Sequence, residues 1–350
     1  MDEAFARLRE LMLLRAPAGV EDPMREHLLE ALAAHGEPRV DPAGNVLLRI
    51  AGQGRRPAVA LAAHLDEIAT VVRRVEPDGR VRLGALGDTH PWVWGESVLE
   101  LLGDHETVLG ALSFGARHVS DESPQRKQVD AEEPLRWRDT WVETRRSPGE
   151  LAAAGVRPGT RAILAPARRE PVRLGVDGAW IAGHYLDDRL GVLVLLLLAE
   201  RVDAPPGDVE LVFSSREEVG CEGVQYHLRR STDIETLIAV EVHPTAAEYG
   251  VDAGPEPVVF AGDARTMFPP AVVRGLVAAG ERAGTGVRVA VPARYGSDAS
   301  TALHAGLVAR GGAVAATTDN THGLEIAHLD APERLARLLH EWLAGDADAS

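Results

Sequence analysis

The strongest constraint on the fold is a regular alternation of apolar strand-like runs and helical segments after Asp187. The expected helices repeat apolar residues on one face, and the expected strands are short and rich in β-branched residues. In chain order they are a helix over 189–201, strands over 209–214 and 236–242, a helix over 270–283, a strand over 287–291, a short helix after 297, a strand near 313 and a helix over 331–343. Such alternation predicts an α/β domain with a mixed or parallel sheet covered by helices.

The N-terminal segment follows the same pattern. Apolar residues recur on one helical face between residues 5 and 12, and Asp22-Pro23 opens a second helix that Gly36 ends. Residues 46–50 and 59–63 are expected strands, and the second is almost entirely apolar, as a central strand buried on both faces would be. We therefore assign this segment to the same sheet.

A long stretch between these two parts has a different texture. Over residues 70–177, short β-prone runs are interrupted by turn dipeptides such as Asp78-Gly79, and we find no helical period before residue 148. We predict a small β-barrel-like domain over 70–177, inserted into an α/β domain made of residues 1–69 and 178–350. The polar segment 120–139 is expected to be a surface excursion.

Composition narrows the possible partners. A formal net charge of -16 argues against non-specific nucleic-acid binding, which depends on Lys and Arg. A single cysteine, Cys221, excludes an internal disulfide, and the N-terminus lacks the pattern of a signal peptide. The longest apolar run, residues 191–199, is far shorter than the roughly 20 residues that span a bilayer. We expect a cytoplasmic protein with no nucleic-acid or membrane partner.

Acids and histidines cluster at the ends of the expected strands and at helix starts. The segments that carry them are Ala63-His64-Leu65-Asp66-Glu67, Leu186-Asp187-Asp188, Glu217-Glu218, Val240-Glu241-Val242-His243 and Thr321-His322-Gly323. Each alone has an ordinary explanation as a surface ion pair, a helix cap or a solvated turn. Together they fall where α/β proteins build their sites, at one edge of the sheet.

The residue types in these segments favour a pair of metal ions. Two histidines and several carboxylates suit two divalent ions with a shared carboxylate and open positions. Neighbouring acids such as Glu217 and Glu218 repel in a cleft unless a cation compensates them. His64 and Asp66 point to the same side of a strand, so Asp66 could hold the second ring nitrogen. A structural zinc site is not expected, because the chain has one cysteine.

Taken in order, the motifs AHLDE, LDDRLG, REEVGCEG, IAVEV, GSDAS and THGLE resemble the metal-dependent glutamyl aminopeptidases, a family that includes the TET aminopeptidases and proteins labelled endoglucanases. The resemblance spans nearly the whole chain. It implies that Asp187 bridges two ions. His64 and Glu241 would be the further ligands of one ion, and Glu218 and His322 those of the other. It also implies that Glu217 is the general base and acid, acting on a metal-activated water, and that Asp66 supports His64.

The resemblance carries further expectations about metal, substrate and assembly. Zn²⁺ is the expected ion, with Co²⁺ or Mn²⁺ as alternatives. Short peptides would lose their N-terminal residue, and the inserted domain would mediate dimerisation, with a dimer or a dodecamer as the final assembly. Two departures are a Glu at position 241, where the family commonly has Asp, and His243, which we interpret as a surface histidine.

Three other functions compete with this one. A metal-dependent amidase or deacylase of a small N-acyl amino acid or modified dipeptide would use the same ions. A non-catalytic assembly protein would retain the fold but not need Glu217. An endoglucanase would need two carboxylates flanking a sugar bond and not a histidine-containing metal pair.

Overall fold

The computed structural model describes residues 1–118 and 123–345, and it divides into two compact units. Unit 1 comprises Met1–Asp66 and Pro171–Ser350, and unit 2 comprises Glu67–Glu170. The sequence placed the second boundary at 177/178. Residues just after 170 belong to unit 1 because β10 (Val172–Leu174) pairs with β11 (Trp180–Gly183). Part of the expected surface excursion, residues 120–122, lies outside the described residues.

Unit 1 is built on an eight-stranded mixed sheet in the order β1-β2-β12-β3-β13-β16-β14-β15. Its strands are β1 (Arg39–Val40), β2 (Val46–Ile50), β3 (Ala58–His64), β12 (Val209–Ser214), β13 (Ile234–Pro244), β14 (Val258–Phe260), β15 (Arg288–Ala290) and β16 (Arg310–Thr318). The four central strands, β12, β3, β13 and β16, run parallel, so their carboxyl ends share one edge. The predicted α/β class with a mixed sheet is confirmed.

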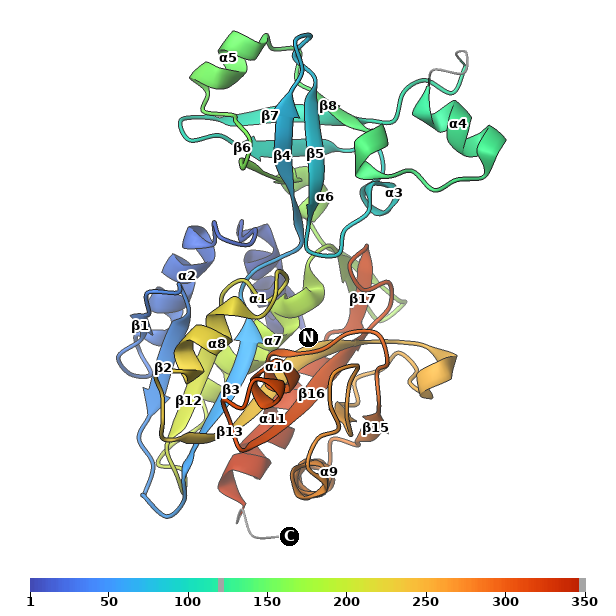
Figure 1. Cartoon of the computed structure of the whole chain (residues 1–350). Helices are drawn as coiled ribbons and strands as arrows, with labels where there is room; N and C mark the ends of the chain where they lie inside the picture. The colour runs from blue at the N-terminus through green and yellow to red at the C-terminus, as the bar shows by residue number, and fades with distance from the viewer. Residues whose placement is uncertain (119–122, 346–350) are drawn as a thin grey trace. The chain divides into compact units, whose positions relative to one another are not determined.

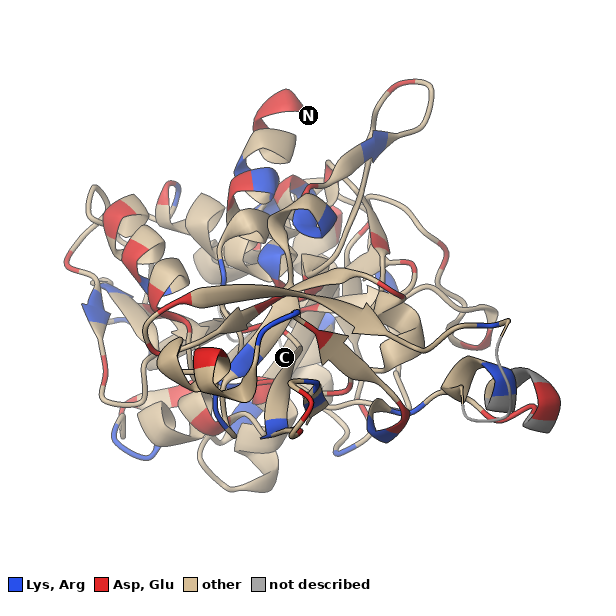
Figure 2. Ribbon diagram, turned by 90° about the horizontal axis from the view of Figure 1, so that it is seen from above, with Lys and Arg blue, Asp and Glu red and all other residues tan. Residues whose placement is uncertain are grey.

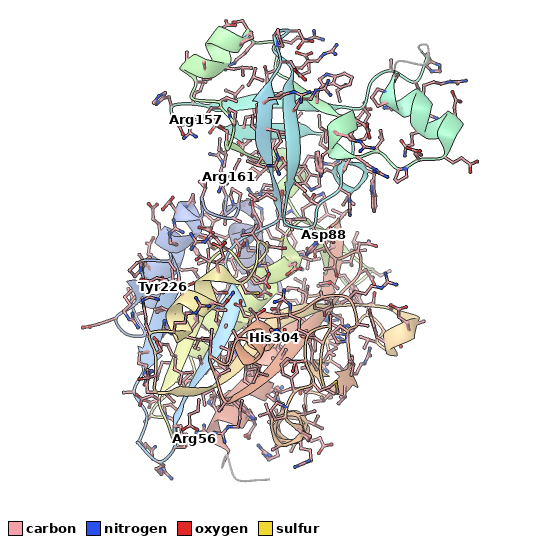
Figure 3. All side chains as sticks on the ribbon, viewed as in Figure 1. Arg56, Asp88, Arg157, Arg161, Tyr226 and His304 are labelled. Carbon is pink, nitrogen blue, oxygen red and sulfur yellow. The ribbon has the colours of Figure 1, made fainter. Side chains whose placement is uncertain are left out.

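Helices cover both faces of this sheet (Figure 1). One face packs against α1 (Asp2–Leu13), α2 (Asp22–Leu32), α7 (Leu186–Ala199), α9 (Pro270–Ala283) and α11 (Ala331–Ala344). The other packs against α8 (Glu222–Leu228) and α10 (Asp298–His304), where Figure 3 labels Tyr226 and His304. Helix α7 is buried almost all round, and each leucine that it buries contributes about 1.5–3 kcal/mol.

A second, smaller antiparallel sheet belongs to unit 1, in the order β10-β11-β17. Its last strand, β17 (Glu325–His328), follows the loop that carries His322. The short 3-10 helix η2 (Ala247–Tyr249) lies after β13. This small sheet holds Glu325 opposite Gly183, just before Asp187 in the chain.

Unit 2 is a closed barrel in the order β4-β5-β8-β7-β6-β9. Its strands are β4 (Ala69–Val75), β5 (Val81–Leu86), β6 (Val98–Leu102), β7 (Thr107–Ser113), β8 (Trp141–Glu143) and β9 (Arg161–Leu164). The expected inserted β-barrel is confirmed. Although the sequence shows no helical period before residue 148, unit 2 has short helices there. Besides α5 (Pro148–Ala153) and α6 (Pro166–Arg169), unit 2 contains α3 (Pro91–Trp94), α4 (Pro124–Ala131) and η1 (Trp137–Asp139). A proline at the start of α3 and α4 presets the first turn, and both are too short to show a helical period.

Acidic and basic positions are intermingled along the ribbon (Figure 2). Within residues 1–118 and 123–345, no helix combines the length and the apolarity that crossing a bilayer requires.

Candidate metal centre

The candidate centre lies at the carboxyl ends of the parallel strands. His64 is the last residue of β3 and is aligned with Ser214, the last residue of β12. Every residue of β3 is buried because both faces of the sheet are covered. Arg56, labelled in Figure 3, precedes the opposite, amino end of the same strand. The apolar strand β3 therefore places His64 at the edge of the sheet.

Asp187 contacts two histidines through its two carboxylate oxygens. Its Oδ1 lies 3.0 Å from Nε2 of His64, and its Oδ2 lies 3.3 Å from Nε2 of His322. Burial would raise the pKa of Asp187, but the hydrogen bonds and charges of the two histidines lower it more strongly, to well below its usual range. The peptide bond between Asp187 and Asp188 is cis.

The other expected ligands converge on the same place. His64, Asp187 and Glu218 each offer a ligand atom within 4.8 Å of the others, and so do His64, Asp188 and Glu241. His322 Nε2 also lies 3.6 Å from Oε1 of Glu218. All five residues expected to bind metal are thus brought together, and Asp188 joins them.

Asp66 has a different principal partner from the one expected. Its carboxylate accepts hydrogen bonds from the backbone amides of Glu217, at 2.9 Å, and Glu218, at 3.2 Å. Nδ1 of His64 lies 3.2 Å from the backbone oxygen of Asp66 and 3.5 Å from its carboxylate. Asp66 therefore positions the turn after β12 as well as contacting the imidazole.

The buried acids of the centre outnumber the cations beside them. Burial raises the pKa of Glu217 to about 8 and that of Glu218 to about 7, and neighbouring carboxylates contribute to both shifts. The pKa of Glu241 and that of Asp188 are raised well above the usual values, again mainly by burial. When its acids are ionised, this group of side chains therefore carries more negative than positive charge. The nitrogen and oxygen donors present fit divalent cations, which would supply the missing positive charge.

Glu325 is a residue of the centre to which the sequence reasoning gave no role. One of its oxygens accepts from the backbone amide of Asp187 at 3.1 Å, and the other accepts from that of His322 at 3.2 Å. Burial raises its pKa to about 8. Its spacing, three residues after His322 within the THGLE motif, was the available signal.

The interpretation of His243 as a surface histidine is wrong. The residue is 0% exposed, and its ring packs edge-on against Tyr249 and Phe260. Nδ1 lies 2.8 Å from the backbone oxygen of Pro244, and burial lowers the pKa of the ring to about 4. Strand β13 continues to Pro244, two residues further than the expected strand, and carries His243 into the core.

Comparisons with known proteins agree with this architecture. The fold is similar to that of the TET1 peptidase of Pyrococcus horikoshii, with a TM-score of 0.85, 21% identity and coverage of 98% of this chain and 99% of the other. The glutamyl aminopeptidase of Lactococcus lactis subsp. cremoris is 24% identical over 257 residues, covering 72% of this chain and 70% of the relative. SgcX of Escherichia coli is 28% identical over 212 residues, covering 59% of this chain. The match spans about half of the length of that relative, 53%.

An α/β domain with an inserted barrel places this chain in the fold class of the TET1 peptidase. The model of the M42 glutamyl aminopeptidase family matches residues 44–338. The chain belongs to this peptidase family, and the resemblance predicted from the sequence motifs is confirmed.

Proposed function

We propose that this protein is a dinuclear-metal aminopeptidase that removes the N-terminal residue of short peptides. The observation that carries the proposal is the placement of Asp187 between His64 and His322, with a different carboxylate oxygen toward each ring. A carboxylate with one oxygen toward each of two imidazoles is suited to bridging two ions.

In this proposal each ion has its own pair of further ligands. His64 and Glu241 would hold one ion, and Glu218 and His322 the other, with Asp187 shared. Zn²⁺ is the metal that we propose for both positions, because nitrogen and oxygen donors suit it, and Co²⁺ or Mn²⁺ would suit the same donors. When bound, such ions supply Lewis-acid polarisation of a carbonyl and acidify water.

Glu217 is the residue that we assign to proton transfer. Its carboxylate lies near His64 and Glu218 and accepts from Sγ of Cys221, while its backbone amide donates to Asp66. A partly buried carboxylate with a raised pKa can hold a proton near neutral pH and release it to the leaving amine. The hydrogen bonds that Asp66 accepts fix the turn that carries Glu217 and Glu218, so Asp66 acts as a positioning residue.

The substrate assignment is tested with paired peptides that have free or N-acetylated amino termini. We expect the zinc-loaded protein to cleave only the free peptides and Glu217→Gln to lose at least about 10²-fold in kcat. Cleavage restricted to acetylated compounds would instead identify the amidase or deacylase. No turnover of either class by metal-loaded protein would favour the non-catalytic assembly protein.

The ligand assignment is tested by counting bound ions. After dialysis, we expect two zinc ions per chain in the wild type, about one in His322→Ala and fewer than one in Asp187→Ala. His304→Ala is a matched control, because His304 lies at the end of α10, outside the proposed ligand set. Equal zinc contents in the wild type and Asp187→Ala would contradict a bridging role.

We also propose that the protein forms a homo-oligomer through unit 2. The TET1 peptidase of Pyrococcus horikoshii can assemble into a tetrahedron or a large octahedral shell, and this chain has a similar fold. Light scattering on the purified protein distinguishes a dimer from a dodecamer, and a monomer at micromolar concentration would contradict the proposal.

A further inference from the structure

A third cluster of potential ligands lies beside the proposed metal pair. Glu217, Cys221 and Asp298 each offer a ligand atom within 4.8 Å of the others. Sγ of Cys221 lies 3.1 Å from Oε1 of Glu217, and Cys221 and Asp298 are each 2% exposed. This cluster contains a sulfur atom, whereas the proposed metal pair is held by nitrogen and oxygen atoms only.

Hydrogen bonds from neighbouring hydroxyl groups hold two of the three side chains in place. The hydroxyl of Thr301 donates to Sγ of Cys221 at 3.3 Å, and the hydroxyl of Ser214 donates to Oδ2 of Asp298. The other carboxylate oxygen of Asp298, Oδ1, is buried without a hydrogen-bond partner among the described residues. An unpartnered buried carboxylate oxygen is costly, and a cation is one means of satisfying it.

We propose that Glu217, Cys221 and Asp298 form an additional, inhibitory site for a thiophilic divalent cation of the zinc class. One thiolate and two carboxylates are ligands that zinc accepts, with water completing the coordination. On binding, the cation forms a bond to Sγ, the S–H bond breaks and its proton passes to solvent. No electron is transferred.

Occupation of this site would block catalysis by engaging Glu217. A carboxylate bound to a cation does not accept a proton readily, so excess zinc would inhibit an enzyme whose proposed metal pair is already full. This consequence rests on the proposed function of Glu217. The binding of the cation does not rest on it.

The sulfur atom makes the site separately observable. Cys221 is the only cysteine in the sequence, so a thiolate-to-metal charge-transfer band in the ultraviolet can come from no other residue. The protein is first loaded with two equivalents of zinc and then titrated with Cd²⁺, which gives such a band when a thiolate binds it. We expect a band equivalent to one thiolate in the wild type and none in Cys221→Ser.

Inhibition by excess zinc is measured on the same proteins. We expect the inhibitory zinc concentration to rise by at least about tenfold in Cys221→Ser and in Asp298→Asn. Thermal unfolding of each variant verifies that it folds. Absence of the band in the wild type, or equal inhibition in the wild type and folded Cys221→Ser, would overturn the proposal and leave Cys221 as a hydrogen-bond donor to Glu217.

The cation site and the proposed aminopeptidase function can be contradicted independently of each other. A wild-type band that Cys221→Ser lacks, in a protein without peptidase activity, would support the cation site and contradict the proposed function. Peptide cleavage by a protein that gives no band would do the reverse.

Discussion

The carboxylate of Asp66 accepts a hydrogen bond from the backbone amide of Glu217, with Oδ1 2.9 Å from the nitrogen. Its other oxygen accepts from the next amide, that of Glu218. Asp66 is 0% exposed, so these two amides depend on it rather than on water. One acid after β3 therefore positions the turn after β12, from which two of the proposed functional residues project.

Replacing Asp66 tests this arrangement. Asp66→Ala leaves two amides without their acceptor, and we expect the free energy of unfolding to fall by about 2 kcal/mol. Asp66→Asn retains one acceptor and should lose less. Urea unfolding measures both, with the exposed Asp203→Ala as the control. Equal stabilities of Asp66→Ala and Asp203→Ala would show that the turn does not depend on Asp66.

Glu325 offers a second test, directed at the metal centre. Its carboxylate accepts from the backbone amides of Asp187 and His322, so Glu325→Ala should loosen both residues. We expect zinc affinity to fall by about 10–100-fold, as with other outer-shell partners. Competition with a zinc-binding dye measures it, and the exposed Glu281→Ala should bind zinc as the wild type does. Unchanged affinity in Glu325→Ala would contradict a supporting role.

Glu210 allows a prediction of how the stability of the protein changes with pH. Burial alone would raise the pKa of this carboxyl, but His227, 3.4 Å away, and the charges of Arg49 and Arg39 lower it below its usual value. A lowered pKa in the folded state contributes stability above the usual glutamate pKa of about 4.3, and this contribution is lost as the pH falls.

We therefore expect Glu210→Gln to be less stable than the wild type by about 1 kcal/mol at pH 7. The gap should narrow as the pH falls from about 5 to 3. Chemical unfolding at a series of pH values measures it. A gap that widens toward acid would mean that Glu210 has a raised pKa instead.

Unit 2 contains a buried ion pair whose contribution to stability can be tested. Arg169 Nη2 lies 2.9 Å from Oε2 of Glu67, and both side chains are 0% exposed. Arg169→Met would leave a buried carboxylate without this partner and should cost about 3–5 kcal/mol. Adding Glu67→Gln should recover part of the loss. Unfolding measurements on the two single variants and the double variant give the coupling, and strictly additive losses would contradict it.

The central part of the fold was predictable from local pattern. The predicted strand 209–214 and helix 270–283 match β12 and α9. Each has a clear apolar pattern along its whole length, which local sequence is enough to reveal. Helices α3 and α4 were not predicted, because so short a segment shows no repeat and depends on packing within unit 2. Similarly, β14 and the three strands of the small sheet, β10, β11 and β17, have only three or four residues each. They form because neighbouring strands pair with them, which the local sequence does not reveal.

The sequence by itself determined the α/β class, the inserted barrel and the family, because hydrophobic periodicity and whole motifs are local properties of the chain. Tertiary structure alone decided which acids share a site and what each one contacts. Asp187 meets His64 and His322 only because the ends of separate elements converge at one sheet edge. The burial of His243 and the contact of Cys221 with Glu217 were likewise decided by packing, which brings together residues whose contacts no local pattern records.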